Sequence, residues 1–244
     1  MDYPIKHISA SSLKKFMTCP YSFKARYILK LQQPGNEHFA YGKSIHAAIE
    51  LQIKMKKKYG KNLPTLAILK EYQRVAKREA ATLDEDAKDR FREMYLGGHT
   101  LTEQAYYKIL ELNPIDSEKY FKVDMGYKLP VLGYIDLLFT DGLMDTKTAA
   151  KAWDKSKINS DFQFTIYNEA YKILYGEYPK TLGILLLDKK KAISDPKNSV
   201  YVQPVTRNGM HKEKLDLAIE ELFEGMESNN YPRCMKPNCW ACNL

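Results

Sequence analysis

The sequence predicts an α/β protein: a central mixed β-sheet flanked by helices, with a helical lobe near the N-terminus and a Cys-rich tail at the C-terminus. Three observations predict this class. The first half carries apolar residues at helical spacing, and the second half alternates short apolar runs with helical stretches. Three of the four cysteines lie in the last eleven residues, which sets the tail apart from the rest of the chain.

The composition excludes several protein classes. A chain of 244 residues with 44% hydrophobic residues is long enough to bury a core without disulfides. No repeat or linker divides it, so we expect a single domain over 1–244. No apolar run approaches the ~20 residues of a membrane span, and the first residues lack the apolar stretch of a secretion signal. We therefore expect no membrane contact and a cytoplasmic location, in the host cytoplasm if a virus encodes the protein.

The charge is unevenly distributed. The net charge is +8, and residues 1–80 hold 16 Lys and Arg against 5 Asp and Glu, whereas residues 81–244 hold 22 against 25. A basic half on a nearly neutral body indicates a polyanionic partner, with nucleic acid as the default. A general solubility charge explains the imbalance equally well at this point.

The first half is largely helical. Segment 9–30 predicts two helical stretches broken at Cys19-Pro20, with Ser11 or Ser12 as the first N-cap. After a loop around Pro34-Gly35, three further helices are expected within a lobe that spans 31–115. Their ranges are 40–59, 64–81 and 84–112.

The second half predicts the sheet core, which we place at 116–206. A helix with Asn159 or Ser160 as its cap is expected at 160–175, and a last helix at 210–228. Pro204 favours an edge position for the last strand, because proline cannot donate a ladder hydrogen bond. The expected strands are 119–127, 131–139, 143–149, 181–187 and 199–206.

Asp136 interrupts the apolar strand 131–139, and buried carboxylates are usually paired or bound to metal. Asp145 and Lys147 are two residues apart on the next strand, so they share a face. With Asp141-Gly142 as a two-residue hairpin loop, Asp136 lies opposite Lys147, with Asp145 diagonal to it. A three-residue loop would turn Asp136 away from both.

Such a cluster has a plausible chemistry. Paired carboxylates are ligands that Mg²⁺ or Mn²⁺ prefers. A lysine beside them positions or deprotonates water, or stabilises developing charge. Together they fit metal-assisted phosphodiester hydrolysis. A structural salt-bridge cluster is the alternative.

The four cysteines form a split set. Without an export signal we expect a reducing compartment, where disulfides are rare. Four thiolates with tight spacing at one end are typical of a tetrahedral metal site or an iron–sulfur cluster. Such a site would join the tail at 229–244 to the start of the chain. The cysteines are Cys19, Cys234, Cys239 and Cys242.

Taken in order, these motifs resemble the RecB-like branch of the PD-(D/E)XK nuclease superfamily. Within it, the chain is most similar to the iron–sulfur-containing CRISPR-associated and viral single-domain exonucleases and to the AddB nuclease domain. The opening ISASSLKKFMTCPYSFKARY is also similar to theirs, and the resemblance extends from Ser9 to Cys242. The motifs are Gly42-x(2)-Ile45-His46, Gly133-Tyr134-Ile135-Asp136, Asp145-Thr146-Lys147, Gln163-x(3)-Tyr167 and the four cysteines.

The resemblance implies a restriction-endonuclease-like core and a role for each matching residue. Lys147, Asp145 and Asp136 would be catalytic, and Gln163, Tyr167 and Glu50 would contact DNA or support the site. The cysteines would hold a 4Fe-4S cluster, with Zn²⁺ as the less favoured alternative. Two departures stand out: the close Cys pair comes last instead of first, and Asp145 replaces a frequent Glu. The implied ligands of Mg²⁺ or Mn²⁺ are His46, Asp136, Asp145 and the Thr146 carbonyl.

The resulting expectation is a divalent-metal-dependent deoxyribonuclease that acts as an exonuclease on single-stranded DNA or frayed ends. Its setting would be recombination, repair, replication or spacer processing, with protein partners of a repair, replication or CRISPR-type complex. The oligomeric state stays open. Alternatives are a structure-selective endonuclease, a DNA-binding module with a silenced site, and a zinc-binding interaction protein. The lysines proposed to contact phosphates are Lys54, Lys56, Lys57, Lys58 and Lys61.

Overall fold

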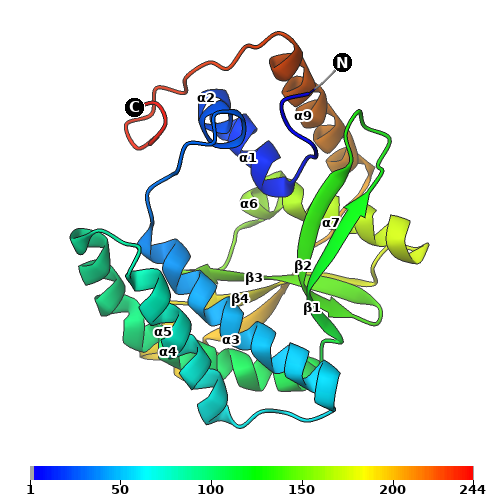
Figure 1. Cartoon of the computed structure of the whole chain (residues 1–244). Coiled ribbons are helices and arrows are strands. Elements are labelled where there is room, and N and C mark those ends of the chain that lie inside the picture. The colour runs from blue at the N-terminus through cyan, green and yellow to red at the C-terminus, as the bar shows by residue number, and fades with distance from the viewer. Residues whose placement is uncertain (1–2, 244) are drawn as a thin grey trace.

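The computed structural model describes residues 3–243 as a five-stranded sheet covered by helices on both faces (Figure 1). The strand order is β1-β2-β3-β4-β5; β3 and β4 are parallel, and the other neighbouring pairs are antiparallel. The mixed sheet confirms the predicted fold class. The strands are β1 (Asp116–Val123), β2 (Val131–Phe139), β3 (Gly142–Ala149), β4 (Thr181–Asp188) and β5 (Val200–Pro204).

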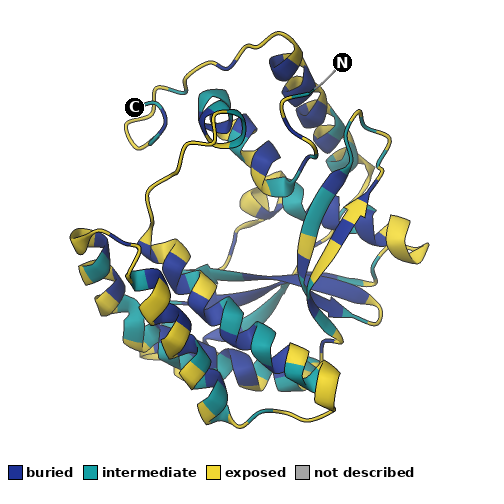
Figure 2. Ribbon diagram, in the orientation of Figure 1, coloured by how far each residue is buried: buried dark blue, intermediate teal, exposed yellow. Residues whose placement is uncertain are grey.

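One face of the sheet is covered by three long helices: α3 (Glu37–Tyr59), α4 (Thr65–Ala80) and α5 (Glu85–Leu112). The apolar stripe of α3 predicted from the sequence, including Ile45 and Ile49, is buried in the core shared with this face. Figure 2 shows that these helices are buried toward the sheet and exposed on the outside. An α-helix has 3.6 residues per turn, so apolar residues spaced by four lie on one face. That face packs against the sheet because it is the apolar one.

The opposite face is covered by α1 (Ala10–Thr18), α7 (Phe162–Tyr175) and α9 (Gly209–Glu227). The predicted helical first half is therefore divided between the two faces, and the predicted domain boundaries stay a prediction. The short helices are α2 (Pro20–Phe23), the π-helix η1 (Lys24–Ile28), α6 (Lys155–Ser160), α8 (Lys191–Ser194) and the 3-10 helix η2 (Pro196–Asn198).

Two helix caps differ from the prediction. Ser9, and not Ser11 or Ser12, caps α1: its Oγ accepts from Ser12 N, while Ser12 Oγ accepts from Ser9 N. Asp161 caps α7 in place of Asn159 or Ser160, because those two residues end α6.

The register of the β2–β3 hairpin also differs from the prediction. Phe139 pairs with Gly142, so the loop is Thr140-Asp141. Gly142 belongs to the strand because β4 approaches it closely: a Cβ there would lie 2.1 Å from the Thr181 carbonyl oxygen. Continued by one pair, this register places Asp136 opposite Asp145 and not opposite Lys147.

Candidate active site

The predicted site residues meet where β2 and β3 separate. The two strands pair only from Leu137–Met144 to Phe139–Gly142; beyond that point β2 pairs with β1, and β3 with β4. The divergence frees the backbone of Thr146 from the β2–β3 ladder. Its N–H donates instead to Asp136 Oδ2 at 2.9 Å, which holds the carboxylate in the gap.

His46 enters the same gap from α3. Its Nε2 lies 2.9 Å from the Thr146 carbonyl oxygen, and its Nδ1 lies 3.5 Å from Asp136 Oδ2. Because a carbonyl only accepts hydrogen bonds, Nε2 carries the proton, and the other ring nitrogen faces a carboxylate oxygen. A proton on Nδ1 or a bound cation makes this contact attractive, so the position is suited to a cation.

Glu118 is a further acidic residue of the site that the sequence analysis missed. The β1–β2 register pairs Ser117 with Leu137 and Lys119 with Ile135, which leaves Glu118 against Asp136. Its backbone has a φ of 48°, a left-handed conformation that is unusual for a non-glycine residue. Ligand atoms of Glu118, Asp136 and His46 lie within 4.8 Å of one another. Burial, with Asp136 next, raises the pKa of Glu118.

Asp145 is the most deeply buried carboxylate of the site, with 1% of its surface exposed. Its Oδ2 lies 2.7 Å from Lys147 Nζ but is buried with no hydrogen-bond partner among the described residues. Burial, with the nearby Asp136 charge next, raises the pKa of Asp145 to about 7 against the pull of Lys147. Lys147 supplies one positive charge beside two carboxylates, Asp145 and Asp136, and buried carboxylates are usually paired or bound to metal.

Lys147 is held by Asp145 and by Gln163 at the start of α7. Gln163 Oε1 accepts from Lys147 Nζ at 2.9 Å, and Gln163 Nε2 donates to Asp145 Oδ1 at 2.8 Å. Burial alone would lower the pKa of Lys147, but Asp145 and Asp136 outweigh it and raise the pKa above the usual value. The side chain is therefore an ammonium ion in this arrangement.

Tyr167 supports Gln163 from the next helical turn. Gln163 Nε2 lies 2.8 Å from the Tyr167 hydroxyl, which donates in turn to the Tyr134 carbonyl. Burial raises the pKa of Tyr167 well above its usual value, so the hydroxyl keeps its proton. Gln163 and Tyr167 are four residues apart on α7 and lie on one face of it, as predicted. Glu50 lies on the same pocket as His46 and forms an ion pair with Lys54.

The donor set at the strand divergence fits a hard divalent cation. It offers carboxylate oxygens, a backbone carbonyl oxygen and one imidazole nitrogen, and oxygen-rich sets suit Mg²⁺ or Mn²⁺. The ligand atoms of His46, Glu118 and Asp136 within 4.8 Å of one another and the buried Asp145 carboxylate beside them favour a cation here.

The four cysteines lie together near the C-terminal end of α1, as predicted. Cys19 ends α1 and caps α2 with its sulfur, and the tail lies beside α2 (Figure 1), where Tyr21 N donates to the Pro232 carbonyl at 3.2 Å. The Sγ atoms of Cys19 and Cys242 are 3.5 Å apart, those of Cys19 and Cys239 3.6 Å, and those of Cys234 and Cys242 3.8 Å. The set is therefore positioned to bind a metal or a cluster.

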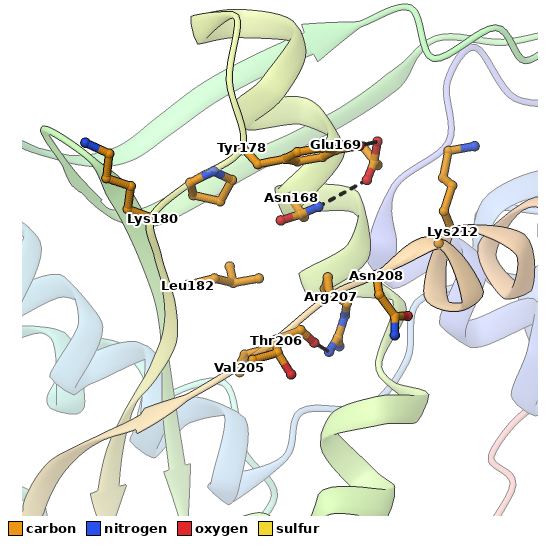
Figure 3. Close-up of a pocket in the computed structure, with 12 residues that line it drawn as sticks. Asn168, Glu169, Tyr178, Lys180, Leu182, Val205, Thr206, Arg207, Asn208 and Lys212 are labelled. Atoms are coloured by element: carbon orange, nitrogen blue, oxygen red, sulfur yellow. Dashed lines mark hydrogen bonds between the residues drawn. The ribbon is translucent and has the colours of Figure 1, made fainter.

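Two pockets are candidates for a substrate site. One, of about 560 Å³, is lined by His46, Thr146 and Lys147 together with residues of α3 and α4. A second, of about 430 Å³, lies between the middle of α7, the start of β4, the segment that follows β5 and the start of α9 (Figure 3). It is lined by polar groups such as Asn168, Glu169 and Arg207 and contains no residue of the predicted site. The first pocket is the candidate substrate site.

Among residues 3–243, no helix combines the length and the apolar character that crossing a membrane requires. A comparison with curated proteins finds no match to this chain. A family model of the PD-(D/E)XK nuclease superfamily matches residues 7–244, which include every predicted site residue. The geometry of Asp136, Asp145 and Lys147 and this match agree on one conclusion: the chain belongs to the PD-(D/E)XK nuclease superfamily, whose members are metal-dependent nucleases acting on DNA.

Proposed function

We propose that this protein is a metal-dependent DNA exonuclease that hydrolyses phosphodiester bonds at single-stranded or frayed ends. The observation that supports it best is the convergence of Asp136, Asp145 and Lys147 in the gap between β2 and β3. All residues expected from the resemblance are present, so a silenced binding module is disfavoured.

In this proposal the cation is held in the gap and Glu118 joins the predicted set. A divalent cation there would polarise the scissile phosphate and favour ionisation of the attacking water. The Nε2 contact between His46 and Thr146 fixes the ring so that Nδ1 points at the carboxylates. The proposed ligands are His46, Glu118, Asp136, Asp145 and the Thr146 carbonyl.

Lys147 acts through its positive charge. As an ammonium ion it donates to the phosphate oxygen on which charge develops, and it has no need to remove a proton from water. Gln163 holds it in place by bonding both Lys147 and Asp145. Tyr167 fixes the Gln163 amide in turn, so the set is preorganised before substrate arrives.

The choice of an exonuclease rests on the resemblance to single-domain relatives with a split cysteine set. The same resemblance supports a role in recombination, repair, replication or spacer processing. A structure-selective endonuclease uses the same chemistry, and only a substrate without ends separates the two.

The cysteine site is proposed as a clamp that joins α1 and α2 to the tail. The resemblance favours a 4Fe-4S cluster. The sulfur separations favour a single tetrahedral ion, because thiolates ~2.3 Å from one ion stand about 3.8 Å apart. A four-iron cluster is larger and would spread the same four sulfurs.

The deciding test is digestion of end-labelled linear single-stranded DNA with Mn²⁺ or Mg²⁺, beside a circular single strand. We expect only the linear strand to be degraded, and Asp145→Ala to abolish this. Cutting of the circle would establish an endonuclease instead. If protein with an occupied cysteine site cuts neither substrate, the catalytic proposal is wrong.

A further inference from the structure

The pocket beside the metal site has an exposed aromatic wall. Phe39 is 70% exposed and lines this pocket together with His46 and Lys147. Phe39 and His46 are seven residues apart on α3, which places them on one face, about 10 Å apart along the helix axis. At about 3.4 Å per stacked nucleotide, this distance spans about three nucleotides of one strand.

Gly42 lies between Phe39 and His46 on α3 and has no side chain that could fill the pocket between them. A Cβ on Gly42 would lie 3.4 Å from Thr148 Oγ1, so α3 already approaches β3 closely here. Both residues line the pocket. The wall formed by Phe39 therefore opens onto the metal site without an intervening side chain from α3.

Two cations flank the aromatic wall on the same pocket. Lys43 Nζ lies 2.9 Å from Glu79 Oε2, and Arg78 donates to Glu79 Oε1 from Nε at 3.0 Å and from Nη2 at 2.8 Å. One nearly buried carboxylate thus holds two exposed cations side by side, with one positive charge in excess. A guanidinium has five donors, so Arg78 retains donors for an anion.

The lysines expected to contact phosphates are less suited to that role. Lys54 is paired with Glu50, and Lys57 with Asp116. Lys56 donates to Asn113 at 2.5 Å. Lys43 and Arg78 share Glu79, but both line the pocket where Phe39 lies, and none of the five lysines does.

We propose that Phe39 stacks on an unpaired base of the DNA strand, while Lys43 and Arg78 bind an adjacent phosphate. This proposal rests on the proposed nuclease function and names its nucleotide-binding subsite. A base held in a duplex presents no free face, so the subsite selects single strands or frayed ends. Stacking on an aromatic ring is independent of sequence, because every base has a π-face.

The test measures binding of a fluorescent single-stranded oligodeoxynucleotide by anisotropy, with Ca²⁺ present so that cleavage is not required. We expect Phe39→Ala to weaken binding about 5- to 150-fold, the range for one stacked base. The matched control is Leu96→Ala, because Leu96 is 77% exposed on α5 and does not line the pocket. It should bind as the wild type does.

A series of oligonucleotides with one abasic site moved along the strand locates the contact. At one position the wild type should lose affinity and become equal to Phe39→Ala, because the base that stacks is missing. Arg78→Ala should lower the slope of log affinity against log salt by about 0.7. Arg74→Ala, which removes an exposed arginine from the same helix but outside the pocket, should leave the slope unchanged.

Three results would overturn the subsite. Phe39→Ala binds DNA as tightly as Leu96→Ala, or the wild type loses the same affinity at every abasic position, or the wild type does not bind DNA. Cleavage is scored separately. If the protein binds DNA through Phe39 but does not cut it, the subsite stands and the nuclease proposal is wrong. If it cuts DNA but Phe39→Ala binds normally, only the subsite is wrong.

Discussion

The side-chain oxygen of Gln163 accepts a hydrogen bond from Lys147 Nζ at 2.9 Å, although the two residues come from a helix and a strand. The same amide donates to Asp145, so one glutamine bonds both members of an ion pair. Gln163 is therefore placed to position the lysine without touching the reacting atoms.

Gln163→Ala should lower the cleavage rate by roughly 10–100-fold, as loss of a supporting hydrogen bond does in metal sites. Lys147 keeps its charge but its side chain is held less firmly, so DNA binding in the presence of Ca²⁺ should change little. Single-turnover cleavage of labelled DNA measures the rate. Asn168→Ala on the same helix, in the pocket of Figure 3, is the control. An unchanged rate in Gln163→Ala would reject the positioning role.

Lys147→Met should reduce cleavage by about 10²–10³-fold, because the phosphate loses its charged donor. Mn²⁺ binding by calorimetry should persist, since the carboxylates remain. Lys151→Met, an exposed lysine beyond β3, should cleave normally. Loss of Mn²⁺ binding together with activity would mean that the lysine is structural.

Glu118→Gln should weaken Mn²⁺ binding by about tenfold or more, because the amide removes one negative charge from the cation site. Titration calorimetry on metal-free protein measures this directly. Glu111→Gln removes an exposed carboxylate that pairs with Lys108 and should have no effect. Equal affinities for both variants would exclude Glu118 from the site.

Cys242→Ser should release the metal centre and lower the melting temperature, because the last residues of the tail lose their link to Cys19. The earlier part of the tail keeps the Tyr21–Pro232 hydrogen bond and the contact of Arg233 with the Tyr21 ring. Limited proteolysis should remove the tail from this variant first. Met235→Ala, exposed in the same tail, is the control. Iron with a brown colour identifies a cluster, whereas zinc in a colourless preparation identifies a single ion. If neither metal is found, the clamp proposal is wrong.

Glu79→Gln should lower the free energy of unfolding at neutral pH by roughly 0.5–1 kcal/mol. Burial alone would raise the pKa of Glu79, but bonds from Lys43 and Arg78 outweigh it and hold the pKa below its usual value. A depressed carboxyl pKa stabilises the fold above the unfolded-state pKa of about 4.5, and this is lost as pH falls through the folded-state value. Denaturant titrations should show the two proteins converging as the pH falls from about 4.5 through the lowered folded-state pKa.

The helices and strands were largely predictable because their patterns are local. The β2 range was predicted residue for residue, and α4, α5 and α9 were predicted to within a residue or two. The start of β1 was predicted three residues late. The residues before Lys119 pair with the end of β2 and carry no strand pattern of their own.

The amino-acid sequence by itself determined the element order, the acidic cluster and the split cysteine set, because residue type and short-range spacing are enough for these. Only the tertiary structure decided the hairpin register, since the close approach of β4 to Gly142 moved the turn to Thr140-Asp141. Only strand pairing brought Glu118 to Asp136. Contacts between distant segments depend on how strands and helices pack, and no local pattern records them.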